Sequence, residues 1–171
     1  MTHDSTQLPD ALRARLRQAP LWEFALALYG RDGVEAACLT LQDEAGVDVC
    51  ELLWHCWLYR HGLACELPPD AVRRWQHEVT APLRRLRRAL KAEARTDKGV
   101  AALRRTLQQA ELQAEREALT RLQRLALSGA GIRPLPTPPP DPLAHLAARF
   151  HLHETSHLIK LKMLISQLDP S

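Results

Sequence analysis

The sequence predicts an all-α protein, and three observations support this class. Ala, Leu and Arg dominate the 171 residues, whereas aromatic residues make up only 5% and β-branched residues are sparse. Straight-chain residues lose little rotamer freedom in a helix, so this composition favours helix throughout. No run with period-two alternation indicates a strand, and signals that start and stop helices recur along the chain. We therefore expect a helical bundle: three short capped helices, a long antiparallel helical pair and a linker-tethered C-terminal helix.

The three short helices are expected between residues 20 and 62. The first is LWEFALALY, residues 21–29, which is apolar nearly all round. Gly30 follows it, and we expect this glycine to supply a left-handed cap. The other two are predicted by D-x-x-E capping pairs followed by glycines: Asp32 and Glu35 with Gly46, then Asp48 and Glu51 with Gly62.

The long helical pair is expected over residues 82–95 and 100–127, with a turn at TDKG, residues 96–99. A helix that begins after Pro69 must bend or restart at Pro82, because proline lacks an N–H and clashes with the preceding turn. Thr80 is the expected cap for that restart.

The chain is expected to have four parts: an N-terminal segment at 1–19, a helical domain at 20–128, a Pro-rich linker at 129–142 and a C-terminal amphipathic helix at 143–171. Six of the twelve prolines fall between 134 and 142, which is typical of a stiff, extended linker. We expect a cytoplasmic protein without membrane contact, because neither a secretion signal nor 18 consecutive apolar residues occur. The four cysteines are then expected to be buried thiols.

A short metal-binding motif occurs near the C-terminus. HETSH, residues 153–157, matches the H-E-x-x-H pattern, in which His153 and His157 of one helix would ligate zinc and Glu154 would act as general base. The third ligand of zinc peptidases does not follow in LIKLKMLISQLDPS. No catalytic residues are therefore assigned, and zinc at these three positions stays open as an alternative.

The same helix carries a heptad stripe that favours packing. Leu143, Ala147, Phe150, Glu154, His157, Leu161, Leu164 and Leu168 follow a spacing of four and three residues. Such a stripe is typical of a helix that faces another helix, either of its own chain or of a partner. We predict a partner-binding face, for another protein or a second copy, at Phe150, His157, Leu161, Leu164 and Leu168.

A basic stretch is the third candidate. Residues 73–105 contain eleven Lys or Arg residues and three acids, whereas the whole chain has a net charge of +3. One face of the expected helix 82–95 carries Arg84, Arg88, Lys91 and Arg95, a spacing suited to a row of phosphates. Alternatively, these arginines pair with acids of the facing helix, Glu111, Glu115 and Glu117.

Three segments resemble an uncharacterised bacterial family of small helical proteins. They are LWxFALxLYGRxGV at 21–34, ACLxLQDExGVDV at 37–49 and LLWxCWL at 52–58. The similarity extends loosely to about residue 127. It implies a small helical cytoplasmic protein and supplies no catalytic residues.

The features together favour a non-enzymatic protein-interaction module, an adaptor or accessory protein that acts through the C-terminal helix. A nucleic-acid or ribosome-associated protein that uses the basic helix is the first alternative. A metal-binding protein or zinc hydrolase at HETSH is the second.

Overall fold

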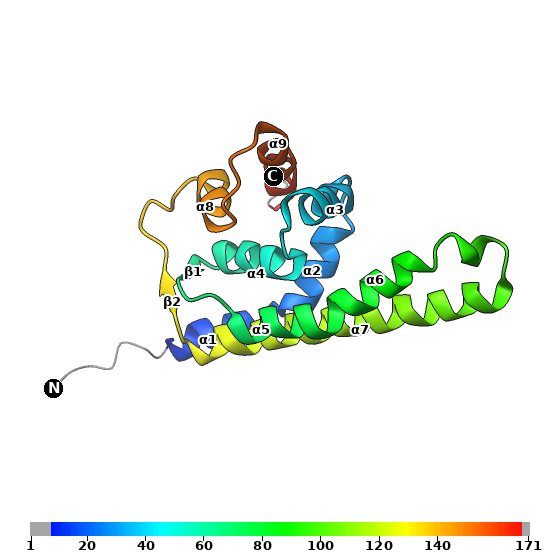
Figure 1. The fold of residues 1–171 in the computed structure, drawn as a ribbon. Coiled ribbons are helices and arrows are strands. Elements are labelled where there is room, and N and C mark those ends of the chain that lie inside the picture. The colour runs from blue at the N-terminus through cyan, green and yellow to red at the C-terminus, as the bar shows by residue number, and fades with distance from the viewer. Residues whose placement is uncertain (1–7, 169–171) are drawn as a thin grey trace. The chain divides into compact units, whose positions relative to one another are not determined.

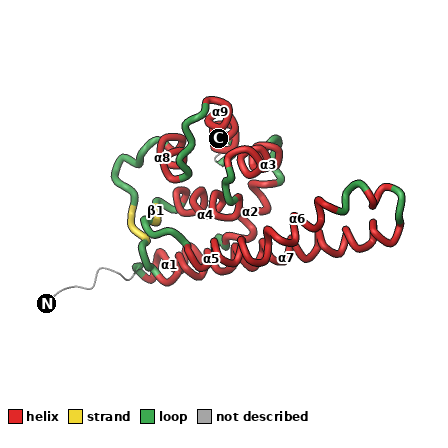
Figure 2. Tube along the Cα trace, in the orientation of Figure 1, coloured by secondary structure: helices red, strands yellow, loops and turns green. Residues whose placement is uncertain are grey.

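The computed structural model describes residues 8–168. Helices account for most of this range, as Figure 2 shows, so the predicted all-α class is confirmed. The described part of the chain divides into two compact units: one contains residues 8–68 and 123–168, and the other is Pro69–Leu122. This division differs from the expected single domain at 20–128, because the C-terminal segment belongs to the same unit as the first helices.

The first unit is built around one central helix (Figure 1). Its elements are α1 (Asp10–Gln18), α2 (Leu21–Tyr29), α3 (Val34–Ala45), α4 (Val49–Arg60), β1 (Leu63–Cys65), β2 (Ile132–Pro134), α8 (Pro142–Arg149) and α9 (Thr155–Ser166). Helix α4 contacts α2, α3, α8 and β1, and every residue from Cys50 to Leu58 is buried. Trp57 is fully buried, and its Nε1 donates to the carbonyl of Ala19 at 2.8 Å. The apolar LLWxCWL segment is therefore the centre of the core.

The predicted helix boundaries hold better than the predicted caps. Asp48 caps α4 as expected, since its carboxylate accepts from the Glu51 N–H at 3.1 Å. Asp32 does not cap α3; Gly33 takes the N-cap position with φ +78°, a conformation that glycine adopts at little cost. Gly30 ends α2 at φ −78°, so the expected left-handed cap at this glycine is wrong.

The Pro-rich segment contains a short strand that the sequence did not predict. Strand β2 pairs antiparallel with β1, with Ala64 opposite Arg133. The pairing continues beyond the strands, where the Leu135 N–H donates to the carbonyl of Gly62 at 2.8 Å. Farther along, the Tyr59 hydroxyl donates to the Pro140 carbonyl at 2.8 Å. The segment is thus fixed on the first unit and is not a free linker; three-residue strands are too short to produce a recognisable alternation.

The expected continuous helix over 143–171 is wrong. Helix α8 ends at Arg149, and α9 begins at Thr155 with Glu154 as its N-cap residue. Between them His151 adopts φ +53°, and the buried Leu152 donates its N–H to the carbonyl of Ala147 at 2.9 Å. The reversal allows α8 to pack on α4 while α9 packs on α3.

The second unit is a helical hairpin, as predicted. It contains α5 (Asp70–Trp75), a π-helical turn η1 (Gln76–Thr80), α6 (Ala81–Ala89), a 3₁₀ turn η2 (Glu93–Arg95) and the first part of α7 (Lys98–Ser128), up to Leu122. Figure 1 shows α6 running beside α7. The chain reverses between α6 and α7, but earlier than expected: α6 ends at Ala89 and not at 95, and Lys98 and Gly99 already belong to α7. Asp97 starts α7 by accepting from the Val100 N–H at 2.9 Å.

A π-helical turn replaces the restart expected at Pro82. The Ala81 N–H donates to the carbonyl of Gln76, five residues back, and this wider turn precedes the proline. Thr80 has helical dihedral angles and does not act as a cap. Its hydroxyl instead donates to Oε1 of Gln76 at 2.6 Å. The widening is a common way to insert a residue without ending a helix.

In the described part of the chain, no helix is both long enough and apolar enough to cross a membrane.

Candidate functional site

The residues of HETSH do not all lie on one helix in the structure. His153 and Glu154 lie before α9 and are exposed, so His153 and His157 do not share a helical face. His157 is buried, with Nε2 at 3.3 Å from Glu44 Oε2 and Nδ1 at 3.9 Å from Glu154 Oε2. Across residues 8–168, no group of three or more His, Cys, Asp or Glu side chains is placed to hold a metal ion. The H-E-x-x-H geometry that would support zinc is therefore not formed by these residues.

The predicted partner-binding face lies inside the chain's own fold. Leu161 and Leu164 are fully buried, and Leu168 and His157 are 7% exposed. Phe150 is half-buried, with its ring 5.6 Å from that of His55 in an edge arrangement. The expected position of Glu154 in an apolar stripe is wrong, since its side chain is 75% exposed. Because α9 packs on α3, this face is occupied intramolecularly.

The four predicted basic residues do not form one row. Arg84 is directed to the facing helix, where it pairs with Glu111 and Glu115. Arg88 lies exposed on α6. Lys91 and Arg95 lie beyond the end of α6 and together line a pocket. The chain thus uses some of these cations for packing and leaves others at the surface.

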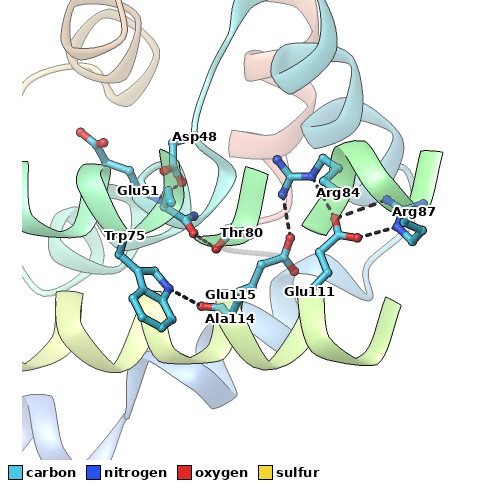
Figure 3. A network of polar contacts seen from close by, with 10 residues as sticks. Asp48, Glu51, Trp75, Thr80, Arg84, Arg87, Glu111, Ala114 and Glu115 are labelled. Atoms are coloured by element: carbon cyan, nitrogen blue, oxygen red, sulfur yellow. Dashed lines mark hydrogen bonds and ion pairs between the residues drawn. The ribbon is translucent and has the colours of Figure 1, made fainter. Parts of the chain in front are cut away.

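An Arg–Glu network joins α6 to α7 (Figure 3). Arg84 donates from Nε to Glu111 Oε1 and from Nη2 to Glu115 Oε1, both at 2.9 Å, and Arg87 pairs with the other oxygen of Glu111. Glu111 is only 6% exposed. Burial alone raises the pKa of its carboxyl, but the hydrogen bonds and charges of Arg87 and Arg84 outweigh burial and leave the pKa below its usual range. The network is a fixed structural feature of the hairpin.

Trp75 lies near this network on the same hairpin. Its Nε1 donates to the Ala114 carbonyl at 3.0 Å, and the guanidinium of Arg121 lies 4.1 Å from the centre of its ring. The ring is therefore used in packing α5 against α7. No other Phe, Trp or Tyr occurs between 69 and 122.

A shallow pocket of about 310 Å³ opens at the far end of the hairpin. We call it the tip pocket; its lining is Lys91, Ala94, Arg95, Ala101, Arg104 and Arg105. Four of these six residues are cationic and none is acidic. Within residues 8–168, Lys91, Arg95 and Arg105 form no ion pair. The pocket therefore gathers positive charge that the protein itself does not neutralise.

The sequence predicts two of the four cations of this pocket. The spacing of cations predicts Lys91 and Arg95 on a phosphate-facing helix. It does not predict Arg104 and Arg105, which lie on the opposite helix of the hairpin, α7. The signal was present in the expected turn at 96–99, because an antiparallel pair brings residues equally distant from the turn close together. Ala94 and Ala101, with their small side chains, leave the space between the two helices open.

The four cysteines do not form a reactive site. All are free and buried, as expected. Burial, together with the charge of Glu35, raises the pKa of the Cys38 thiol to about 12, and burial also raises the pKa of Cys56 and Cys65. These thiols stay protonated at neutral pH and are poor nucleophiles.

Comparison with protein families places the chain among proteins of unknown function. A family model described as "Protein of unknown function (DUF2390)" matches residues 20–122. The chain belongs to the DUF2390 family. This confirms the resemblance seen in the sequence. No curated protein and no solved structure matches the chain. All lining residues of the tip pocket lie inside the DUF2390 match, whereas HETSH lies outside it.

Proposed function

We propose that the protein is a non-enzymatic helical accessory module that binds the phosphate backbone of nucleic acids through the tip of its hairpin. The observation that carries this proposal is the tip pocket, whose lining contains four cationic residues and no acid. The partner-binding role expected of α9 is less favoured, because its apolar face is buried against α3.

The distribution of charge along the hairpin also supports phosphate binding at the tip. Residues 85–105 contain eight Lys or Arg residues and two acids. One of these acids, Asp97, is engaged at the start of α7. Cations of this density attract phosphates at long range and release counterions when they bind, which makes association depend strongly on salt.

The composition of the hairpin indicates which part of a nucleic acid it would contact. Single-strand binders stack bases on aromatic side chains, and the only Phe, Trp or Tyr of the hairpin is Trp75, whose ring lies against the guanidinium of Arg121. Contacts to phosphates alone position a protein without reading sequence. We therefore expect binding to duplexes of unrelated sequence with similar affinity.

Fluorescence anisotropy with labelled 20-base-pair duplexes tests the proposal. With about four phosphates neutralised, the slope of log K against log salt should be about −3.6, so affinity should fall roughly a hundredfold between about 50 and 200 mM salt. The triple variant Lys91→Gln, Arg95→Gln, Arg105→Gln should make the slope shallower by about 2.7.

The matched control is Arg73→Gln, Arg74→Gln, Arg116→Gln, which removes the same charge from exposed positions elsewhere on the second unit. It should leave the slope nearly unchanged. Equal losses in the two triple variants, or no binding of any duplex at the lower salt concentration, would overturn the proposal.

A further inference from the structure

The tip pocket differs from a diffuse basic surface in that four cationic residues from both arms of the hairpin line one pocket. Lys91 and Arg95 come from the segment that follows α6, and Arg104 and Arg105 come from the first turns of α7. The remaining lining, Ala94 and Ala101, offers only methyl groups. Every polar side-chain group in the lining is thus a hydrogen-bond donor with a positive charge, and none is an acceptor.

One of the four cations is held in place by the protein. Arg104 is half-buried, and its Nε donates to the main-chain carbonyl of Arg87 at 3.2 Å. Arg87 is itself fixed through its side chain, which pairs with the buried Glu111. The Arg104 guanidinium is therefore oriented before any ligand arrives, whereas Lys91, Arg95 and Arg105 are exposed side chains.

An oriented guanidinium suits one ligand chemistry. With Nε engaged, the two Nη nitrogens of Arg104 remain as a planar pair of donors, and such a pair binds two oxygens of one phosphate at once. Less of the side-chain entropy is lost on binding when the arginine is already ordered. Neighbouring cations then add charge without requiring a fixed geometry.

We infer that the tip pocket is a discrete, saturable site in which Arg104 anchors one phosphate group, while on a nucleic-acid backbone Lys91, Arg95 and Arg105 neutralise the neighbouring phosphates. This inference rests on the proposed function, since a nucleic-acid backbone is the expected source of the phosphate. A free polyphosphate carries the same chemical group and would occupy the same pocket. Arg104 sets the position of the phosphate, and Lys91, Arg95 and Arg105 contribute mainly to attraction.

The experiment is an NMR titration of the full chain with inorganic pyrophosphate, which follows backbone amides and arginine Nε–Hε signals. Sodium chloride at matched ionic strength is the reference. We expect saturable shifts confined to residues 91–105, with one equivalent bound. Arg104→Lys should weaken binding about tenfold because lysine cannot keep both the contact to Arg87 and the two-donor fork. Arg105→Lys, the matched control, should weaken binding less than about threefold.

Both variants should melt within a few degrees of the wild-type protein, because each changes a partly or fully exposed side chain. Shifts that grow linearly without saturation, or that match those from sodium chloride, would overturn the inference. Equal weakening by Arg104→Lys and Arg105→Lys would also overturn it, because the anchor would then be no different from its neighbours.

A second titration with a 20-base-pair duplex separates this inference from the proposed function. If the duplex binds through the tip but pyrophosphate does not saturate, the phosphate site is wrong and the proposed function stands. If pyrophosphate saturates the pocket while the duplex neither binds nor displaces it, nucleic-acid binding is wrong and the site serves free polyphosphates.

Discussion

The two ends of the same helical hairpin use arginine differently. Toward α5, the Arg–Glu network holds Arg84 and Arg87 against the buried Glu111. At the other end, the tip pocket brings together four cations with no acid in its lining. The difference arises on α7, which has no acid from residue 98 to 110 and then has Glu111, Glu115 and Glu117. The position of the glutamates on α7 therefore decides which cations of the hairpin join the Arg–Glu network and which lie outside it.

The largest effect is expected from removing the acid at the centre of the network. Glu111→Ala would leave the half-buried guanidinium of Arg87 without its carboxylate partner and that of Arg84 with Glu115 alone. Loss of one partner from a buried ion pair costs about 3 kcal/mol or more, so we expect the free energy of unfolding to fall by about 3 kcal/mol. Urea unfolding followed by circular dichroism measures this.

The same variant should lower the affinity for duplex DNA by less than about tenfold, because Glu111 is not in the lining of the tip pocket but fixes Arg87, whose carbonyl orients Arg104. A loss of stability below about 0.5 kcal/mol, the range of an exposed pair, would mean that the network contributes no more than surface contacts.

The second prediction concerns a variant that adds an acid to the tip pocket, as in the Arg–Glu network. Ala101→Glu places a carboxylate in the pocket, four residues before Arg105 on α7. A Glu four residues before a cation stabilises a helix by about 0.3–0.5 kcal/mol, and its position in the first turns of α7 is also favourable. Affinity for duplex DNA should fall about tenfold or more, because the acid neutralises one cation and repels phosphate.

Ala101→Gln is the matched control, with nearly the same size and no charge. It should retain most of the affinity for duplex DNA. If Ala101→Gln lowers binding as much as Ala101→Glu, the space in the pocket matters and the absence of an acid does not.

Local sequence signals predict most of the fold but only half of the cations of the tip pocket. Several helix boundaries follow from signals that act within a few residues, namely Asp48, the apolar segment at 21–29 and the TDKG segment at 96–99. The break at His151 depends on the burial of Leu152, and the β1–β2 pair joins residues far apart in the chain. Neither has a periodic signal in the sequence.

The candidate site shows the same limit. A row of cations on one helix predicts that phosphates bind there, but it does not show which cations the facing helix neutralises. Arg84 was assigned to the row because of its spacing, and the structure places it against Glu111. Nothing in the local sequence distinguishes Arg104 from Arg105, because only the fold brings Arg104 into contact with the main chain of Arg87.

The third prediction concerns pH and has a smaller effect than Glu111→Ala. The pKa of Glu111 is below its usual range in the folded protein, so its charge stabilises the fold above the unfolded pKa of about 4.3. This contribution is lost as pH falls below that value toward the folded pKa. The difference in unfolding free energy between wild type and Glu111→Gln should therefore be constant from about pH 7 to 5 and decrease below about pH 4.

Urea midpoints at several pH values measure this difference, and the other carboxyl groups cancel because both proteins contain them. A difference that stays constant down to about pH 3 would show that the charge of Glu111 is not what stabilises the network.

The smallest effect is expected for an ion pair with the same geometry in a different environment. Glu117 and Arg121 are also 2.9 Å apart, but their side chains are 41% and 38% exposed, compared with 8% for that of Glu111. Water and salt screen the exposed pair, so Glu117→Gln should lower the free energy of unfolding by less than about 0.5 kcal/mol, and about 0.5 M salt should remove the effect. Urea unfolding at low and high salt measures both quantities. Because the N–O distance is equal in the two pairs, a cost near that of Glu111→Ala would mean that distance, and not burial, sets the strength of Arg–Glu contacts on this hairpin.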